Sequence, residues 1–312
     1  MDATPSTENQ YFTKSKYAGL KENVIIGGTF MAVLAIITVL FLFIGIILYN
    51  GWAKFSWEFI SAFPSDGMTK GGIFPAIVGT FILVIVMSLA AVPFGTITAI
   101  YLTEYAKENS KFAAAVRFSI RTLAVVPSII FGLFGLGFFI QFVGVGADNL
   151  FNGGELHWAQ PNILWASLTM SLLTLPVVIV SVEEALKTIP RELREASLAL
   201  GATKWQTIKN VVFPGSISGI MTGTILAVSR GAGEGAPILF TGAAYYLATL
   251  PTSVSDQFMN LGYHIYIMST QSADVEKTMP IQFATTLVLL MLTISLNIVA
   301  VIIRSRIRSK KL

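Results

Sequence analysis

The sequence predicts an all-α membrane protein with six transmembrane helices and both termini in the cytoplasm. Of its 312 residues, 54% are hydrophobic and 12% are charged. A soluble domain has roughly 25% charged residues. Six apolar runs reach the length of about 20 residues that crosses a bilayer. The distribution of lysine and arginine among the loops gives the orientation.

Each apolar run predicts one helix, and together the six form a transmembrane domain over residues 24–303. The first run is too long for a cleaved signal peptide and lacks an A-x-A exit site. A polar N-terminal tail (1–23), which we expect to be poorly ordered, precedes the domain, and a basic cytoplasmic tail (304–312) follows it. The predicted spans are residues 24–49, 72–101, 122–145, 162–182, 215–241 and 281–303.

The basic residues fix the orientation. With the N-terminus in the cytoplasm, 17 lysines and arginines lie inside, and only Lys54, Lys70 and Lys277 lie outside. Such a split indicates cytoplasmic loops on the basic side. The final run RSRIRSKK is then a topology anchor, which we favour over a nucleic-acid-binding tail. The remaining basic residue, Arg230, falls within an apolar run.

Several classes of chemistry are excluded. The chain has no cysteine, so it has no disulfide and no thiolate metal site. Its two histidines, His157 and His264, are far apart, and we interpret both as polar loop residues. No HExxH, GxSxG or GxxxxGK[ST] motif occurs, so we expect neither an enzyme nor a phosphate loop for ATP. No metal and no cofactor is expected on this chain.

The long cytoplasmic loop 183–214 predicts a helical hairpin. Pro190 suits a first helical turn, and Gly201 can end that helix in a left-handed cap. Thr203 and Gln206 form the pattern of a capping box for a second helix, which Pro214 is expected to break. The apolar side of the hairpin can pack against its own bundle or dock on another protein, and the residue pattern does not decide between the two.

This loop resembles the EAA loop in the permease subunits of bacterial ATP-binding-cassette (ABC) importers. The family pattern is E-A-A, three residues, G, nine residues, then I-x-L-P, and the chain keeps this spacing with mild changes. In the family this loop docks on the ATPase subunit. The resemblance assigns that role to Glu195, Ala196, Ser197, Gly201, Ala202, Val211 and Pro214.

Three other stretches are similar to the phosphate branch of that family, PstA type. They are VPFGTITAIYLTEYA, LAVVPSIIFGLFGLG and AVSRGAGEGAPILFTGAA, with LPTSVSDQF after span five. Gly235 and Val125 depart from the usual residues. The resemblance implies a complex with a PstC-like companion permease, a dimer of PstB-like ATPase subunits that use ATP and Mg, and a PstS-like extracytoplasmic phosphate-binding protein. Inorganic phosphate would be the substrate, membrane lipid would surround the permease, and nucleic acid would have no role.

Two charges inside the fifth span are candidates for the substrate passage. Arg230 offers a planar set of five donors that suits phosphate, and Glu234, four residues on, can reach it. In one hypothesis phosphate displaces Glu234 from Arg230; in another, protonated Glu234 donates to phosphate. A purely structural salt bridge remains the alternative. Arg121 and Ser128 are further passage candidates, although Arg121 also fits a topology anchor.

Small residues recur every four positions along the fifth span, a spacing that lets helices approach closely. They are Gly215, Gly219, Gly223, Ala227, Gly231 and Gly235. On a straight helix this stripe drifts about 40° per step, so we expect it to wind toward different neighbours at its two ends. The glycines and Pro237 also predict a bend or unwound turn at 231–237, beside a cavity.

The sequence therefore favours a permease subunit of an ATP-driven phosphate importer. Two alternatives remain: a permease for another oxyanion, or a stand-alone secondary transporter or channel. The EAA-like loop argues against the stand-alone transporter or channel, because such a protein needs no docking loop for an ATPase.

Overall fold

The computed structural model describes residues 16–107, 109–272 and 274–309 and divides the chain into two units after Tyr49. In this part of the chain, six helices are long and apolar enough to cross a membrane, which confirms the predicted all-α fold with six spans. Most of the predicted N-terminal tail lies outside the described residues. Helix α1 (Lys16–Gly51) nevertheless begins inside it, so residues 16–23 are helical, contrary to the expected disorder.

The first unit consists of α1. Its apolar 18-residue stretch has no buried residue, and large side chains such as Ile25, Phe30 and Phe41 are exposed. A helix that is apolar on all sides is suited to contact with lipid tails.

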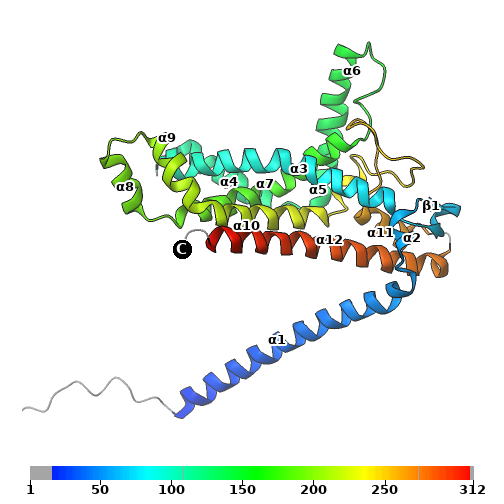
Figure 1. Cartoon of the computed structure of the whole chain (residues 1–312), viewed down its shortest axis with the longest axis horizontal. Coiled ribbons are helices and arrows are strands. Elements are labelled where there is room, and N and C mark those ends of the chain that lie inside the picture. Colours follow the sequence, from blue (N-terminus) through cyan, green and yellow to red (C-terminus); the bar gives the residue numbers. More distant parts are fainter. Residues whose placement is uncertain (1–15, 108, 273, 310–312) are drawn as a thin grey trace, which may run out of the picture. The chain divides into compact units, whose positions relative to one another are not determined.

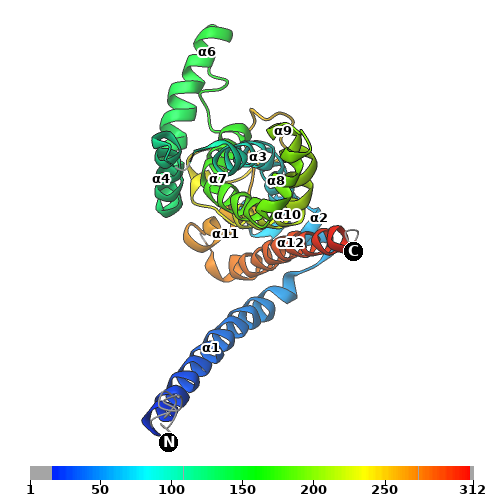
Figure 2. The same ribbon diagram turned by 90° about the vertical axis from the view of Figure 1, so that its left-hand side faces the viewer.

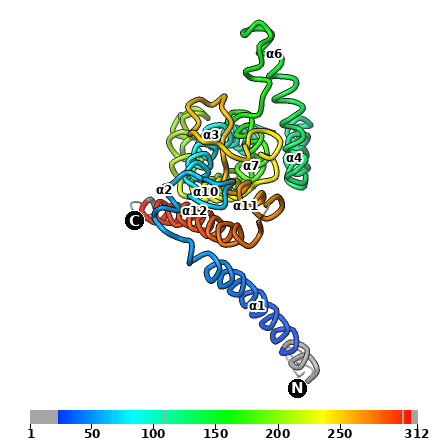
Figure 3. Tube along the Cα trace, turned by 90° about the vertical axis from the view of Figure 1, so that its right-hand side faces the viewer, coloured from blue at the N-terminus to red at the C-terminus, as the bar shows by residue number. Residues whose placement is uncertain are grey.

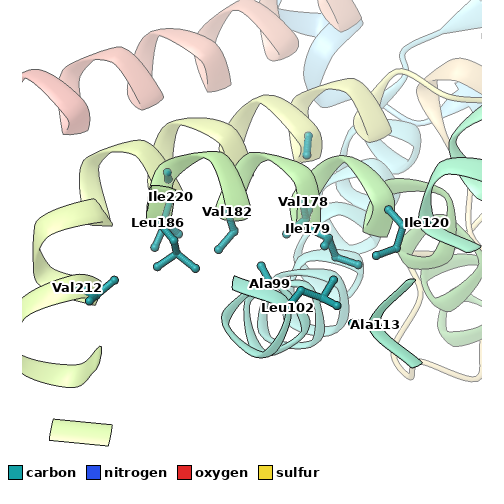
Figure 4. Close-up of a cluster of buried hydrophobic side chains, with 12 residues drawn as sticks. Ala99, Leu102, Ala113, Ile120, Val178, Ile179, Val182, Leu186, Val212 and Ile220 are labelled. Carbon is teal, nitrogen blue, oxygen red and sulfur yellow. The ribbon is translucent and has the colours of Figure 1, made fainter. Parts of the chain in front are cut away.

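In the second unit, α3 (Phe74–Ile100), α7 (Ile163–Lys187), α10 (Phe213–Ala232) and α12 (Val275–Ser309) run side by side (Figure 1). The end views place α7 beside both α3 and α10, with α12 against α10 (Figures 2 and 3). Aliphatic side chains fill the space between α3, α4, α7 and α10 (Figure 4). Members of this core include Ala99, Ile120, Val178, Val182, Leu186 and Ile220.

The third span is broken where the sequence predicted one helix over 122–145. Helix α4 (Lys111–Val125) ends at an extended Val126, with φ −69° and ψ 130°, and α5 (Ser128–Phe134) follows Pro127. A π-helical segment (Gly135–Gly144) and α6 (Val145–Phe151) continue the chain. Proline crowds the residue before it out of the helical region, which explains the break.

The loop between α7 and α10 contains the predicted helix pair, α8 (Arg191–Ala199) and α9 (Lys204–Thr207). Gly201 has φ +86°, and the capping box of Thr203 and Gln206 is complete, as predicted. Pro214 does not break the second helix, because α9 continues through a π-helical turn (Ile208–Val212) into α10. Proline lacks an N–H and crowds the carbonyl four residues back, and the altered register of a π turn accommodates both effects.

Short elements complete the second unit, mostly at the end of the bundle opposite α8. They are a 3₁₀ turn (Trp52–Lys54), α2 (Trp57–Ser61), a 3₁₀ turn (Asp66–Met68) and α11 (Leu261–Thr270). Strands β1 (Pro64–Ser65) and β2 (Lys70–Gly71) pair antiparallel, with Pro64 opposite Gly71 and Ser65 opposite Lys70.

Most of the glycine stripe packs along α7, and its last member, Gly235, faces a different neighbour, so the predicted change of neighbour occurs only at that end. A Cβ built on Gly215, Gly219 or Gly223 would meet Ile189, Ala185 or Ser181, in the last two turns of α7 or just after it. The contact residues on the α7 side thus recur every four positions, as the glycines of α10 do. A four-residue step drifts around a single helix, but two helices that coil around each other can keep such stripes in contact. Gly231 also faces α7, together with Met87 of α3, and Gly235 faces Gly262 of α11.

We expect Gly223→Ala to force α10 away from α7. The added Cβ would lie 2.3 Å from the Ser181 Cβ, closer than packed side chains approach. The melting temperature of the solubilised protein should fall, and a second change, Ser181→Gly, should restore most of the loss. Gly137→Ala is the control, because a Cβ there meets nothing within 4 Å. If Ser181→Gly gave no rescue, the close contact would not be the cause.

His264 is not a polar loop residue, which corrects the expectation for this histidine. It lies on α11, outside the membrane-spanning helices, and only 2% of its surface is exposed. Neither ring nitrogen has a hydrogen-bond partner among the described residues. Because burial disfavours the charged imidazolium, the pKa of His264 falls from 6.5 to about 4.

Acid should therefore destabilise the fold between pH 6.5 and pH 4. Below pH 6.5 His264 is protonated in the unfolded chain, whereas in the folded chain it stays neutral down to about pH 4. The stability lost across this interval corresponds to about 3 kcal/mol. Asp256 titrates below it, since backbone N–H groups of Ser253 and Thr252 hold its pKa under 3.8. Melting temperatures at pH 7 and pH 4.5 measure the loss.

His264→Leu should reduce this difference between the two pH values, whereas His157→Leu, at an exposed position, should retain it. An unchanged acid loss in His264→Leu would assign the effect to other groups.

Candidate functional site

A cavity of about 260 Å³ lies where the broken third span meets α7 and α10. Its walls come from the end of α4, the Val126–Pro127 break, the start of α5 and the middle of α7. Arg230 is the only basic and Glu234 the only acidic side chain among the described residues that line it. Ser128, the first residue of α5, lines it as well. The structure thus brings together three of the four residues that the sequence singled out for a passage.

The backbone unwinds beside this cavity, as predicted. Helix α10 ends at Ala232, nine residues before the expected end of the span at 241, and a 3₁₀ turn (Pro237–Leu239) follows. Close packing holds the unwound segment, since a Cβ on Gly132 of α5 would lie 2.9 Å from the Pro237 carbonyl oxygen. Irregular backbone at membrane depth is tolerated where it lines a cavity, which is its position here.

No ion pair joins Arg230 to Glu234 in the described part of the chain. The expectation that the two would meet assumed a helix through both, which places residues four apart on one face. Glu234 lies beyond the helix end, and its backbone N–H donates instead to the Gly231 carbonyl oxygen at 3.1 Å. Arg230 is exposed and Glu234 partly buried in the single chain, so the guanidinium is free to bind an anion.

Arg121 is placed apart from these residues. It is exposed on α4 and does not belong to the lining of the cavity. Sequence reasoning missed the apolar wall that α7 contributes, which consists of Leu173, Thr174 and Val177. The Thr174 hydroxyl donates to the Met170 carbonyl oxygen at 3.0 Å, so it serves its own helix. No local signal marks these residues, because only the packing of α4, α5 and α7 brings them together.

The helix pair α8–α9 forms a second candidate site, at one end of the bundle. Glu195 and Ala196 are exposed, whereas Ser197 turns inward and its hydroxyl lies 2.9 Å from that of Thr207. Ala202 donates its N–H to the Ser197 carbonyl oxygen. Val211 is partly buried, and Pro214 is exposed. Large apolar side chains nevertheless face outward on this pair, namely Leu193, Leu198, Leu200 and Trp205.

A buried ion pair ties α8 to the end of the second span. Arg194 on α8 lies 2.9 Å from Glu104, and the two side chains are only 18% and 9% exposed. Arg194 also donates to the carbonyl oxygens of Leu186, in the last turn of α7, and Ile189, just after it. Charged hydrogen bonds of this kind are short and directional, so they fix α8 against the span ends.

The described chain is thus a bundle of membrane-length helices with an exposed apolar helix pair at one end and one arginine beside an unwound turn. The chain belongs to the family described as binding-protein-dependent transport system inner membrane component, which residues 91–309 match. It is a permease subunit of an ABC transporter and a multi-pass inner membrane protein, and its partners are the other components of such a transporter.

Relatives and solved structures agree with this assignment. The "Probable ABC transporter permease protein YqgI" of Bacillus subtilis is 31% identical over 236 residues, covering 72% of this chain and 75% of the relative. The "Phosphate transport system permease protein PstA" of Mycobacterium leprae is 39% identical over 169 residues. This match covers 54% of the chain and only 50% of that relative.

Among solved structures, a bacterial ABC transporter involved in the import of alginate has a TM-score of 0.65 at 17% identity. It covers 93% of this chain and 98% of the other. The MetNI methionine transporter gives a TM-score of 0.55 at 18% identity, covering 76% and 94%. At these identities the likeness supports the fold alone.

Proposed function

We propose that this chain forms the translocation passage of an ATP-driven importer of inorganic phosphate, together with a second permease. One observation carries the proposal. Arg230 is the sole cation lining an otherwise largely apolar cavity, and it has no ion-pair partner among the described residues. In a low-dielectric passage, a guanidinium offsets part of the dehydration of an oxyanion far better than it would in water. Relatives named as phosphate transport system permeases add to the case.

The chain itself contributes no ATP chemistry in this proposal. Two ATPase subunits bind ATP and Mg, one of them docks on α8–α9 of this chain, and an extracytoplasmic protein delivers phosphate at the opposite end. The exposed apolar side chains of α8–α9 support a docking role, since such a surface is costly to leave in water. They also disfavour a stand-alone transporter, in which that helix pair would have no partner.

Uptake by the complete, reconstituted transporter tests the proposal. We expect ATP-dependent accumulation of labelled phosphate that excess arsenate reduces and excess sulfate leaves largely unchanged. Equal competition by sulfate would indicate a permease for oxyanions in general. Uptake without ATP would argue for a secondary transporter.

The same proposal places both termini and the α8–α9 pair in the cytoplasm, on the basis of the lysine and arginine distribution. The chain has no native cysteine, so a single introduced cysteine is a unique label site. In intact cells, a membrane-impermeant maleimide should label exposed Thr249→Cys and spare exposed Lys209→Cys until the cells are opened. The reverse pattern would invert the topology.

A further inference from the structure

A second cavity, of about 670 Å³, lies at the end of the bundle that carries α8. The π-helical turn Tyr101–Tyr105, which follows α3, forms one wall of it. The other walls are α4, the end of α7 and the start of α8. It shares no lining residue with the Arg230 cavity. Its volume lies in the range of small-molecule sites, about 300–1,000 Å³, and exceeds what a single oxyanion needs.

The lining of this cavity is strongly basic. Its described residues include one carboxylate, Glu104, and five cations, namely Lys107, Arg117, Lys187, Arg191 and Arg194. Three of the cations are engaged within the fold. Arg194 pairs with Glu104, and Arg117 donates to the Leu102 carbonyl oxygen at 2.7 Å. Arg117 also lies 3.3 Å from Glu183, as does Lys187 at 4.0 Å.

Lys107 and Arg191 remain without an ion pair among the described residues. Both are exposed and line the cavity from different segments, one after the π-helical turn and one at the start of α8. Because Glu104, the one carboxylate among the described residues that line the cavity, is already paired with Arg194, the described lining has an excess of positive charge. A polyanionic oxygen group is the chemistry that such a pair of cations binds.

The surroundings of the cavity match the boundary between membrane and water. Tyr101 and Phe112 are exposed and lie edge to face, with ring centroids 6.2 Å apart, and Tyr105 is exposed nearby. Tyrosines gather at the level of lipid headgroups, and basic pockets between membrane helices bind anionic headgroups there. The cavity therefore has the positive charge, the position at the membrane–water boundary and the volume that a headgroup site requires.

We propose that this cavity binds a phosphate group through Lys107 and Arg191, from either an anionic phospholipid headgroup or free phosphate. Its occupant would contact both the end of the second span and the start of α8, and so stabilise their junction. The inference goes beyond the proposed import activity and does not depend on which substrate the Arg230 cavity conducts.

The test measures the melting temperature of the assembled, solubilised transporter with three probes: dioctanoyl phosphatidylglycerol, dioctanoyl phosphatidylcholine and inorganic phosphate. The variants are Lys107→Gln, Arg191→Gln and their combination. Lys111→Gln is the matched control, since it removes the same charge at an exposed position outside the cavity. All titrations are repeated in Arg230→Gln, which removes the cation of the first cavity.

We expect phosphatidylglycerol to raise the melting temperature of the parent, Lys111→Gln and Arg230→Gln, and phosphatidylcholine to have little effect. Each single variant should weaken the apparent affinity about five-fold and the double variant about twenty-five-fold. The same pattern with inorganic phosphate would identify free phosphate as the occupant. An equal shift in the double variant, or no shift with either anionic probe, would overturn the proposal.

Discussion

Arg230→Gln should lower phosphate uptake by about a hundred-fold at a fixed phosphate concentration, while the transporter still assembles. The charged hydrogen bonds of one guanidinium to an oxyanion are worth up to about 3 kcal/mol, which corresponds to this factor. Arg230 is exposed in the single chain and has no ion-pair partner in the described residues. Its loss therefore leaves no buried carboxylate unpaired, and the fold should not suffer.

Two variants sharpen this expectation. Arg230→Lys keeps the charge but loses the planar pair of donors, so uptake should fall by about ten-fold, between the parent and Arg230→Gln. Arg121→Gln is the matched control, because Arg121 is exposed and does not line the cavity. Its uptake should stay within about two-fold of the parent, the usual range for an exposed substitution. Near-normal uptake in both Arg230 variants would remove Arg230 from the passage.

Glu234 has a different role once the missing ion pair is taken into account. It shares the cavity with Arg230 without neutralising it. A carboxylate in that position repels an arriving anion and speeds its departure, so Glu234→Gln should lower both the half-saturating phosphate concentration and the maximal uptake rate. If Glu234 were only structural, the variant would instead lose melting temperature with these parameters unchanged.

Local signals in the sequence predicted the local structure well. The left-handed Gly201 and the capping box of Thr203 and Gln206 are correct, because each depends on residues within a few positions. The break at Val126 carried a readable signal in the proline that follows it, yet the long apolar run outweighed that signal. The continuity of α9 into α10 was not predictable. It depends on a π-helical turn, whereas Pro214 on its own indicates a helix break.

Long-range relations account for what the sequence did not reveal. Glu104 and Arg194 are 90 residues apart, and no pattern in either segment predicts that the two side chains pair. The glycine stripe was recognised, but not the α7 residues that match its spacing, such as Ala185 and Ser181. The cavity around Arg230 likewise needs three separate segments to close. A pattern in one segment predicts that segment, whereas a site built from several depends on how they pack.

Breaking the Glu104–Arg194 pair should separate ATP hydrolysis from transport. The pair is buried, and Arg194 also satisfies two carbonyl groups at and just after the end of α7. Arg194→Gln would leave Glu104 and both carbonyls without their donor, and losing one partner of a buried pair costs about 3–5 kcal/mol. Helix α8 would then move independently of the second span. We expect phosphate transported per ATP hydrolysed to fall at least about ten-fold.

Glu104→Gln should be milder, because an amide oxygen still accepts from Arg194 and the carbonyl contacts persist. The double variant Glu104→Gln with Arg194→Gln should lose less than the sum of the two single losses, as expected for residues in direct contact. The exposed pair of Asp66 and Lys70, 61% and 73% exposed, is the control, and neutralising it should leave the ratio unchanged. If Arg194→Gln kept the parental ratio of transport to hydrolysis, α8 would transmit the ATPase motion through its other contacts. The bridge between Ser197 and Thr207 would then be the next contact to remove, since it links α8 to the helix that continues into Arg230.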